Sequence, residues 1–255
     1  MRNLSRIAVL GAVTAAAAAA APSAMAANSA VATLTPNKGG SLTVAAPTTF
    51  KLTTTTPDVI YDNSGNTRIK AIKANLPEQL LFNTTGFTPC NTAAFLVSKT
   101  CSSKSKLGSA VVEADGGPDI GKVMATTDLY FGTGFTVLAR VKSDSPAVID
   151  QPVVGELRSS GVRGYGLQMY IPVPADIAMP IERVYPVIRS VTATVKPPTR
   201  SVRVPGEKKK VKLPLAGLGE CKGALNFQVS IVYTDALGVI DKSTDSAATK
   251  ATCKK

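Results

Sequence analysis

The chain has 255 residues, a net charge of +12, four cysteines, and neither histidine nor tryptophan. The absence of histidine excludes Ser-His-Asp and Cys-His catalytic sites as well as histidine-ligated metal centres. An apolar fraction of 44% is that of a folded protein and excludes a disordered polyelectrolyte.

The first 26 residues have the pattern of a secretory signal peptide. Arg2 and Arg6 supply a positive start, residues 7–21 form an uncharged, alanine-rich segment, and Ala24-Met25-Ala26 is a small-x-small cleavage site. The apolar segment is shorter than the roughly 20 residues of a transmembrane helix. We therefore expect a mature chain of residues 27–255 without a transmembrane segment, secreted or held at the cell envelope. A retained membrane anchor is the alternative.

The cysteines of an exported chain are expected to be paired. Four cysteines allow three connectivities, and their spacing favours two local bridges. These bridges join Cys90 to Cys101 and Cys221 to Cys253. With both formed, no thiol is left for catalysis or for a metal.

The composition and patterning of residues 27–255 favour β-strands. This stretch holds 26 threonines and 24 valines, which are β-branched. Alternating apolar residues mark strands at 123–131, 135–141, 153–160, 165–171, 190–195, 210–215 and 225–233. About a dozen strands at this spacing are typical of sandwiches and barrels. We predict an all-β fold, specifically an antiparallel, jelly-roll-like β-sandwich with two disulfides.

Helical patterns are poor outside the first cysteine loop. Residues 91–99 predict one short helical turn there, with Thr92 as its cap. We expect a single domain over residues 27–255. A boundary near 172–181, where Pro172, Pro174 and Pro180 cluster, is the alternative.

The C-terminal quarter predicts a hairpin closed by the second bridge. The turn is expected at residues 235–238, midway between Cys221 and Cys253. Direct pairing about residue 237 would place Tyr233 opposite Asp241 and Phe227 opposite Ala247. Cys221 shares its parity with Phe227 and Tyr233, so its sulfur is expected on the core face.

One stretch resembles a large family of uncharacterised secreted actinobacterial proteins. The residues that carry the resemblance are Leu76-Pro77-Glu78-Gln79-Leu80, Phe82-Asn83, Pro89-Cys90, Thr92-Ala93, Cys101, Ser105 and Leu107-Gly108-Ser109-Ala110. The chain departs from the family pattern at Gln79, Ser102 and Leu107, where the family has a glycine, a proline and a β-branched residue. The resemblance implies a secreted, β-rich fold and carries over no activity or functional residue.

Two patterns in the sequence have the residue types of a chemical site. Residues 103–106 contain the S-x-x-K spacing of penicillin-binding enzymes, but the K-T-G strand and helical subdomain of those enzymes are missing from the sequence. Residues 115–119 and 58–66 are acidic turns that could offer oxygens to calcium, although neither has EF-hand spacing. We interpret these segments as a solvated loop and as ordinary turns, so no catalytic, cofactor or metal residue is predicted.

A basic cluster is the most informative surface pattern. Residues 182–255 carry 14 Lys or Arg and 6 Asp or Glu, a net charge of +8, whereas residues 27–181 carry 13 and 11. The cluster comprises Arg200, Arg203, Lys208, Lys209, Lys210 and Lys212. We interpret it first as a solvated hairpin tip, or as lysines that block edge-to-edge pairing. Contact with an anionic envelope polymer is the functional alternative. Nucleic acid is not expected as a specific ligand, because interleaved aromatic residues are missing.

These patterns predict an exported, non-enzymatic structural or adhesive protein that acts at or outside the cell envelope. A secreted hydrolase that uses carboxylates is one alternative. A glycan-binding or small-molecule-binding module is the other. The placement of the acidic residues relative to any concavity distinguishes the two alternatives.

Overall fold

The computed structural model describes residues 29–41, 44–56, 67–181, 184–203, 210–221, 223–235, 237 and 239–254. The predicted signal peptide lies outside these residues, as do the acidic turn 58–66 and Lys208 and Lys209 of the basic cluster.

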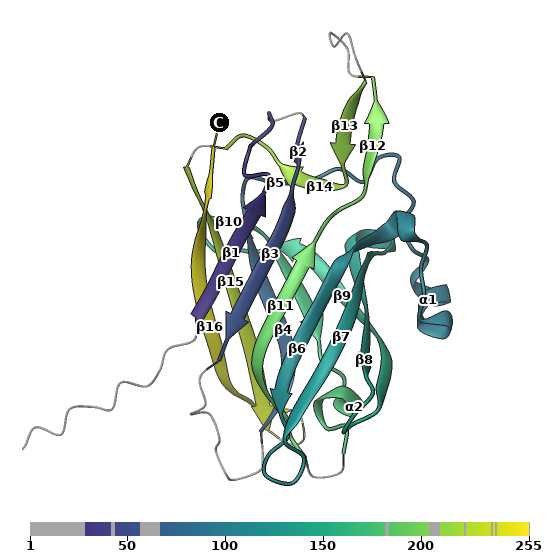
Figure 1. Cartoon of the computed structure of the whole chain (residues 1–255), viewed down its shortest axis with the longest axis vertical. Helices are drawn as coiled ribbons and strands as arrows, with labels where there is room; N and C mark the ends of the chain where they lie inside the picture. The colour runs from purple at the N-terminus through teal and green to yellow at the C-terminus, as the bar shows by residue number, and fades with distance from the viewer. Residues whose placement is uncertain are drawn as a thin grey trace, which may run out of the picture.

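Eleven strands of the described chain form one antiparallel sheet (Figure 1). Their order across the sheet is β1 (Ser29–Thr35), β3 (Thr49–Thr55), β11 (Val187–Val195), β6 (Lys106–Asp115), β7 (Lys122–Phe131), β8 (Thr136–Ser143), β9 (Ile149–Ser159), β10 (Tyr165–Pro172), β4 (Thr67–Pro77), β15 (Gly223–Asp235) and β16 (Asp241–Cys253). The strands predicted from alternation between residues 123 and 233 coincide with β7, β8, β9, β10, β11, β13 and β15.

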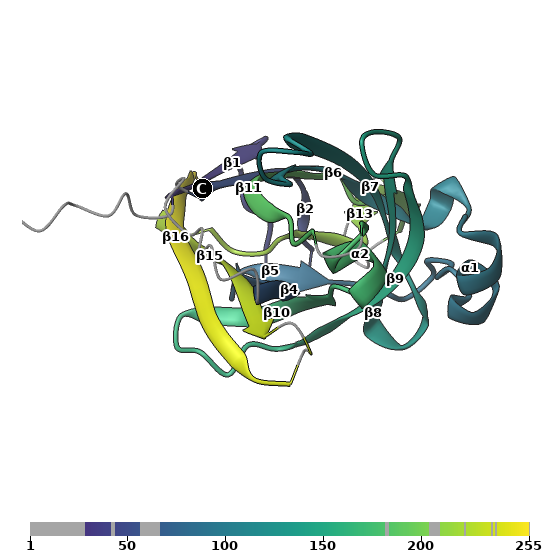
Figure 2. The same ribbon diagram turned by 90° about the horizontal axis from the view of Figure 1, so that it is seen from below.

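The two edges of this sheet meet, so the sheet curls around a common axis (Figure 2). Ala32 and Leu34 of β1 pack against the core cluster that contains Ala251 and Cys253 of β16. Beyond the strands, the Gly39 N–H donates to the Lys254 carbonyl at 3.2 Å. The predicted all-β, antiparallel, doubly bridged fold is confirmed, and its main sheet is a near-barrel rather than the two facing layers of a strict sandwich.

Segments on either side of residues 172–181 share this sheet. β11 lies between β3 and β6, and β15 lies between β4 and β16. The chain between β10 and β11 contains a second short helix, α2 (Ala175–Ala178), which the sequence did not predict.

Small elements cover both ends of the near-barrel. At the upper end lie a three-stranded sheet of β2 (Ala46–Pro47), β14 (Ala216–Leu218) and β5 (Leu80–Phe82), and the hairpin of β12 (Thr199–Val202) and β13 (Val211–Pro214) (Figure 1). α2 lies at the lower end. Among the described residues, no helix has the length and apolar character needed to cross a lipid bilayer.

The first cysteine loop carries the predicted helical turn, α1 (Thr92–Ser98). Its N-cap is Asn91 rather than Thr92, because the Asn91 side chain accepts the Ala94 N–H at 2.9 Å. Phe95 anchors the helix, fully buried in a cluster with Tyr130 and Leu138 on the outer face of the sheet. The loop then continues through a 3-10 turn, Ser103–Ser105, into β6.

The C-terminal hairpin forms, but its predicted register is wrong. Tyr233 lies opposite Ser243 and Phe227 opposite Thr249, whereas Thr234 lies opposite Asp241 across a β-bulge. Two one-residue displacements add up: the turn sets Thr234 opposite Asp241 instead of Ile240, and the bulge between Tyr233 and Thr234 adds one more. The sequence pattern gave no sign of it.

Candidate functional site

The lower half of the near-barrel encloses an apolar cavity with a volume of about 150 Å³. The cavity is walled by inward-facing side chains of seven strands and by the segment around α2. Its lining residues are Ile69, Ile72, Ala110, Val112, Ala114, Val123, Ala125, Thr127, Leu129, Ala139, Val141, Ile149, Val153, Met169, Ile171, Pro172, Val173, Ile177, Pro180, Pro186, Ile188, Val191 and Ala193. Thr127 is the only polar side chain among them, and none is aromatic or charged.

The cavity follows from small inward residues on a wide sheet. An eight-stranded barrel is just wide enough for side chains to fill it, and eleven strands enclose more space. Alanine occupies inward positions on β6, β7, β8 and β11, at Ala110, Ala114, Ala125, Ala139 and Ala193. Side chains this short leave the centre of a wide sheet unfilled.

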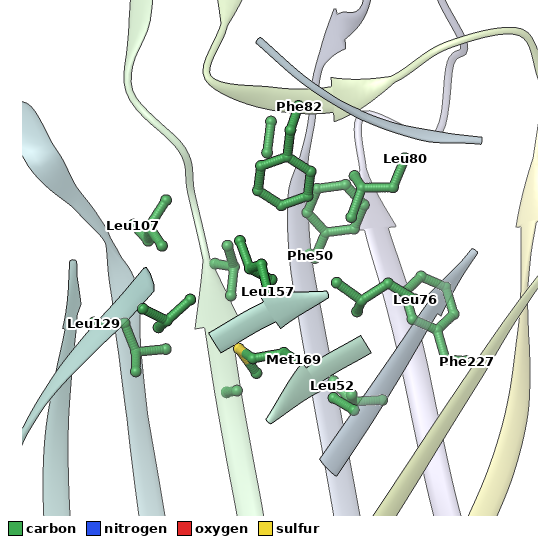
Figure 3. Close-up of a pocket in the computed structure, with 15 residues that line it drawn as sticks. Phe50, Leu52, Leu76, Leu80, Phe82, Leu107, Leu129, Leu157, Met169 and Phe227 are labelled. Carbon is green, nitrogen blue, oxygen red and sulfur yellow. The ribbon is translucent and has the colours of Figure 1, made fainter. Parts of the chain in front are cut away.

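A second cavity of about 80 Å³ lies directly above the first. Figure 3 shows Phe50, Phe82 and Phe227 pointing into it from three different strands. Leu80 and Phe82 of β5 and Ala216 of β14 close it from the three-stranded sheet above. The upper cavity is therefore partly aromatic, in contrast to the aliphatic lower one.

Leu129, Met169 and Ala193 line both cavities and so form the boundary between them. Met169 extends from β10 into this boundary (Figure 3). An unbranched methionine has three rotatable bonds and readily adopts other shapes. The two adjoining cavities are together called the lumen.

The lower end of the lumen is closed by a proline-rich segment rather than by a sheet. Pro172, Val173, Ile177 and Pro180 line the cavity there and are only half-buried. α2 spans just four residues and lacks a side-chain cap hydrogen bond. This end has less regular structure across it than the upper end.

Several charged groups of the described strands pair on the outer face of the sheet, away from the lumen. Arg140 donates from Nε and Nη2 to the two carboxylate oxygens of Asp150, at 2.8 and 2.9 Å. This hydrogen bonding lowers the pKa of Asp150 from 3.8 to about 2. Further ion pairs join Lys122 to Glu113 and Arg189 to Asp115. Every residue that lines the lumen is uncharged.

The S-x-x-K residues lie in the 3-10 turn Ser103–Ser105 and at the start of β6. Lys106 Nζ lies 2.7 Å from Asp128 Oδ1. The hydrogen bond to Asp128 raises the pKa of Lys106 above its ordinary value, so the amine stays protonated. That is the reverse of what a general base requires.

The acidic turn 115–119 has the hydrogen bonds of an ordinary turn. Asp115 Oδ1 accepts the Gly117 N–H at 2.9 Å, while its Oδ2 accepts from Arg189 Nη2 at 2.8 Å. Within the described part of the chain, no three acidic or cysteine side chains come together in a way that could hold a metal ion.

The structure separates the described members of the basic cluster. Arg203 and Lys210 are exposed on either side of residues 204–209, and Lys212 is exposed on β13. Arg200 instead lies over the ring of Phe87, 5.7 Å from its centroid, on the same face as the buried Leu213. Only part of the cluster is thus free to meet a polymer.

Both predicted bridges form. The Cα atoms are 5.7 Å apart in Cys90–Cys101 and 5.8 Å apart in Cys221–Cys253. Cys221 and Cys253 are buried in one cluster with Leu225 and Phe227, so the prediction that Cys221 faces the core is confirmed.

Sequence reasoning found the inward residues of the lumen but not the lumen itself. The alternation in β7 identified Val123, Ala125, Thr127 and Leu129 as one face, which fits a packed sandwich equally well. The repeated alanine at inward positions was the available indication of free space. Comparisons with models of known families, with curated proteins and with solved structures found no significant match.

Proposed function

We propose that the mature chain is an exported, non-enzymatic binding protein that encloses a small aliphatic ligand in its lumen. The observation that carries the proposal is the pair of adjoining apolar cavities inside a sheet of eleven strands. This is the small-molecule-binding alternative of the sequence analysis, with an apolar ligand. A structural or adhesive role remains a separate, untested prediction.

Energetics support a ligand in the lumen. Natural protein interiors hold few voids larger than a water molecule. An empty cavity costs about 24 cal/mol per Å³, so the lower cavity of about 150 Å³ would cost about 3–4 kcal/mol. An apolar cavity of this size accepts a benzene-sized molecule and excludes water. A bound aliphatic molecule would restore the missing contacts.

The placement of the acidic residues favours binding over hydrolysis. A carboxylate hydrolase needs two acidic side chains facing its substrate. The described carboxylates of Asp115, Asp128 and Asp150 each contact a cation on the outer face. The lining of the lumen offers a substrate only apolar contacts and the Thr127 hydroxyl.

The test is isothermal titration calorimetry, in which octanol is titrated into the mature protein. We expect saturable binding with a negative heat-capacity change, the sign of apolar burial. Ala125→Leu combined with Ala193→Leu fills the lumen from β7 and β11 and is expected to abolish binding. Ala248→Leu makes the same chemical change at an exposed position of β16 and should bind like the parent. Equal binding by the lumen variant and the parent would refute the proposal.

A second candidate function is contact with an anionic polymer through the β12–β13 hairpin. This hairpin projects from the upper end of the near-barrel (Figure 1). Exposed Arg203, Lys210 and Lys212 support the candidate, together with the net charge of +8 in residues 182–255. The two candidates use different parts of the molecule, the lumen and the projecting hairpin, and are compatible with each other.

A further inference from the structure

Large aliphatic side chains are exposed at the lower end of the near-barrel. In the turn between β15 and β16, Leu237, Val239 and Ile240 are 80%, 74% and 59% exposed. In the loop between β8 and β9, Val148 is 83% exposed. Single exposed apolar residues are common, but three within four positions of one turn are not. We call these four residues the aliphatic rim.

Polar contacts hold the backbone of the β15–β16 turn so that its apolar side chains point outward. Asp235 Oδ1 accepts the N–H groups of Val239 and Ile240, at 2.7 and 3.2 Å. The Thr234 hydroxyl and the Asp235 N–H both donate to the Ile240 carbonyl at 2.9 Å. Arg68 Nη2 donates to the Leu237 carbonyl at 3.1 Å. Asp235 and Arg68 therefore bind the backbone of the turn, and the exposed side chains of the turn at Leu237, Val239 and Ile240 are aliphatic.

The aliphatic rim is linked to the wall of the lower cavity through neighbouring residues of the chain. Arg68, which holds the turn, precedes Ile69, and Ile69 lines the cavity. On the other side, Val148 precedes Ile149, another lining residue. Tyr233, two positions before Asp235, packs in one cluster with Ile69 and Ile188. The exposed side chains thus adjoin the less regular end of the lumen.

We infer that the lower end docks on a lipid surface, where the aliphatic rim enters the hydrocarbon boundary and the lumen takes up an aliphatic chain. This inference rests on the proposed function. A ligand that the lumen holds by apolar contacts is itself apolar and dissolves poorly in water. Such a ligand is most abundant in a lipid phase. Loops with exposed aliphatic side chains bind an interface by burying apolar area, and this needs no anionic lipid.

The experiment measures co-flotation with phosphatidylcholine vesicles, with and without phosphatidylglycerol. The parent is expected to float with neutral vesicles. The variant Leu237→Ser, Val239→Ser, Ile240→Ser is expected to partition into the vesicles at least about tenfold more weakly than the parent. The control variant is Val31→Ser, Val111→Ser, Met124→Ser, which removes exposed apolar side chains from the outer face of the sheet and should float like the parent. Equal unfolding midpoints establish that all three proteins are folded.

Octanol binding separates failure of this inference from failure of the proposed function. Retained octanol binding by the rim variant, together with its lost flotation, supports docking at the rim. A parent that binds octanol but floats with neither kind of vesicle overturns the inference and leaves the lumen proposal standing. Flotation that requires phosphatidylglycerol and survives in the rim variant also overturns it, in favour of the basic residues. The parent could instead be a dimer that does not float, and the rim variant a monomer. This result assigns the rim to contact with a second copy and overturns docking on lipid.

Discussion

Enlarging an alanine that faces the lumen should stabilise the protein instead of straining it. Ala125 on β7 is buried and lines the lower cavity. Ala125→Leu adds three carbons, and at about 0.8 kcal/mol per buried methylene they gain about 2 kcal/mol. Ordering the leucine side chain costs about 0.5–1 kcal/mol. We expect the free energy of unfolding to rise by about 1–2 kcal/mol, in the range of other cavity-filling substitutions.

The control for this prediction is Ala71→Leu on β4. Ala71 is 1% exposed and lines neither cavity, so the same added carbons do not enter the lumen. Overpacking at such a site costs about 1–3 kcal/mol. Urea unfolding of the ligand-free proteins gives both differences, and thermal unfolding should move by about 2–4 °C per kcal/mol. If Ala125→Leu destabilises the protein as much as Ala71→Leu does, the lumen is not empty space and the reasoning fails.

Three further predictions concern the bridges and the charges. Replacing Cys221 and Cys253 by serine opens a loop with a sequence separation of 32 and should lower the free energy of unfolding by about 3–4 kcal/mol in the chain-entropy model. Urea unfolding measures this loss, and protease mapping should show faster cleavage within Asp241–Cys253. Because the pKa of Asp150 is lowered from 3.8 to about 2, its pair with Arg140 stabilises the fold fully above pH 3.8 and loses this effect as the pH falls toward 2. Asp150→Asn should therefore lower the unfolding midpoint at neutral pH but hardly at pH 2, and an equal deficit at both would contradict the assignment. Replacing Lys208, Lys209 and Lys210 by alanine should weaken salt-sensitive retention on a heparin column more than replacing Lys73, Lys122 and Lys142 does. Equal loss of retention in the two variants would contradict polymer binding by the hairpin.

The sequence by itself determined the local structure and the covalent bridges. Period-two alternation identified β7 to β10 because one face of each strand is buried, and this is a property of neighbouring residues. Cysteine spacing identified both bridges because each closes a local loop. The helical turn around Phe95 followed from residues within one bridge. The register of the last hairpin did not follow, because the turn and the bulge beside it each move the pairing by one residue, so Phe227 lies opposite Thr249 rather than Ala247.

Only the tertiary structure decided that the inward residues surround a lumen. The pairs that set the width of the sheet join segments distant in sequence, such as β11 with β3 and β4 with β15. Alternation states that Ala125 and Ala193 face inward, but it does not state how far away the opposite wall lies. That distance depends on the number of strands in the curled sheet, which non-local hydrogen bonding fixes. The same alanines would be packed core in a sandwich, and here they border a cavity because the sheet that carries them is eleven strands wide.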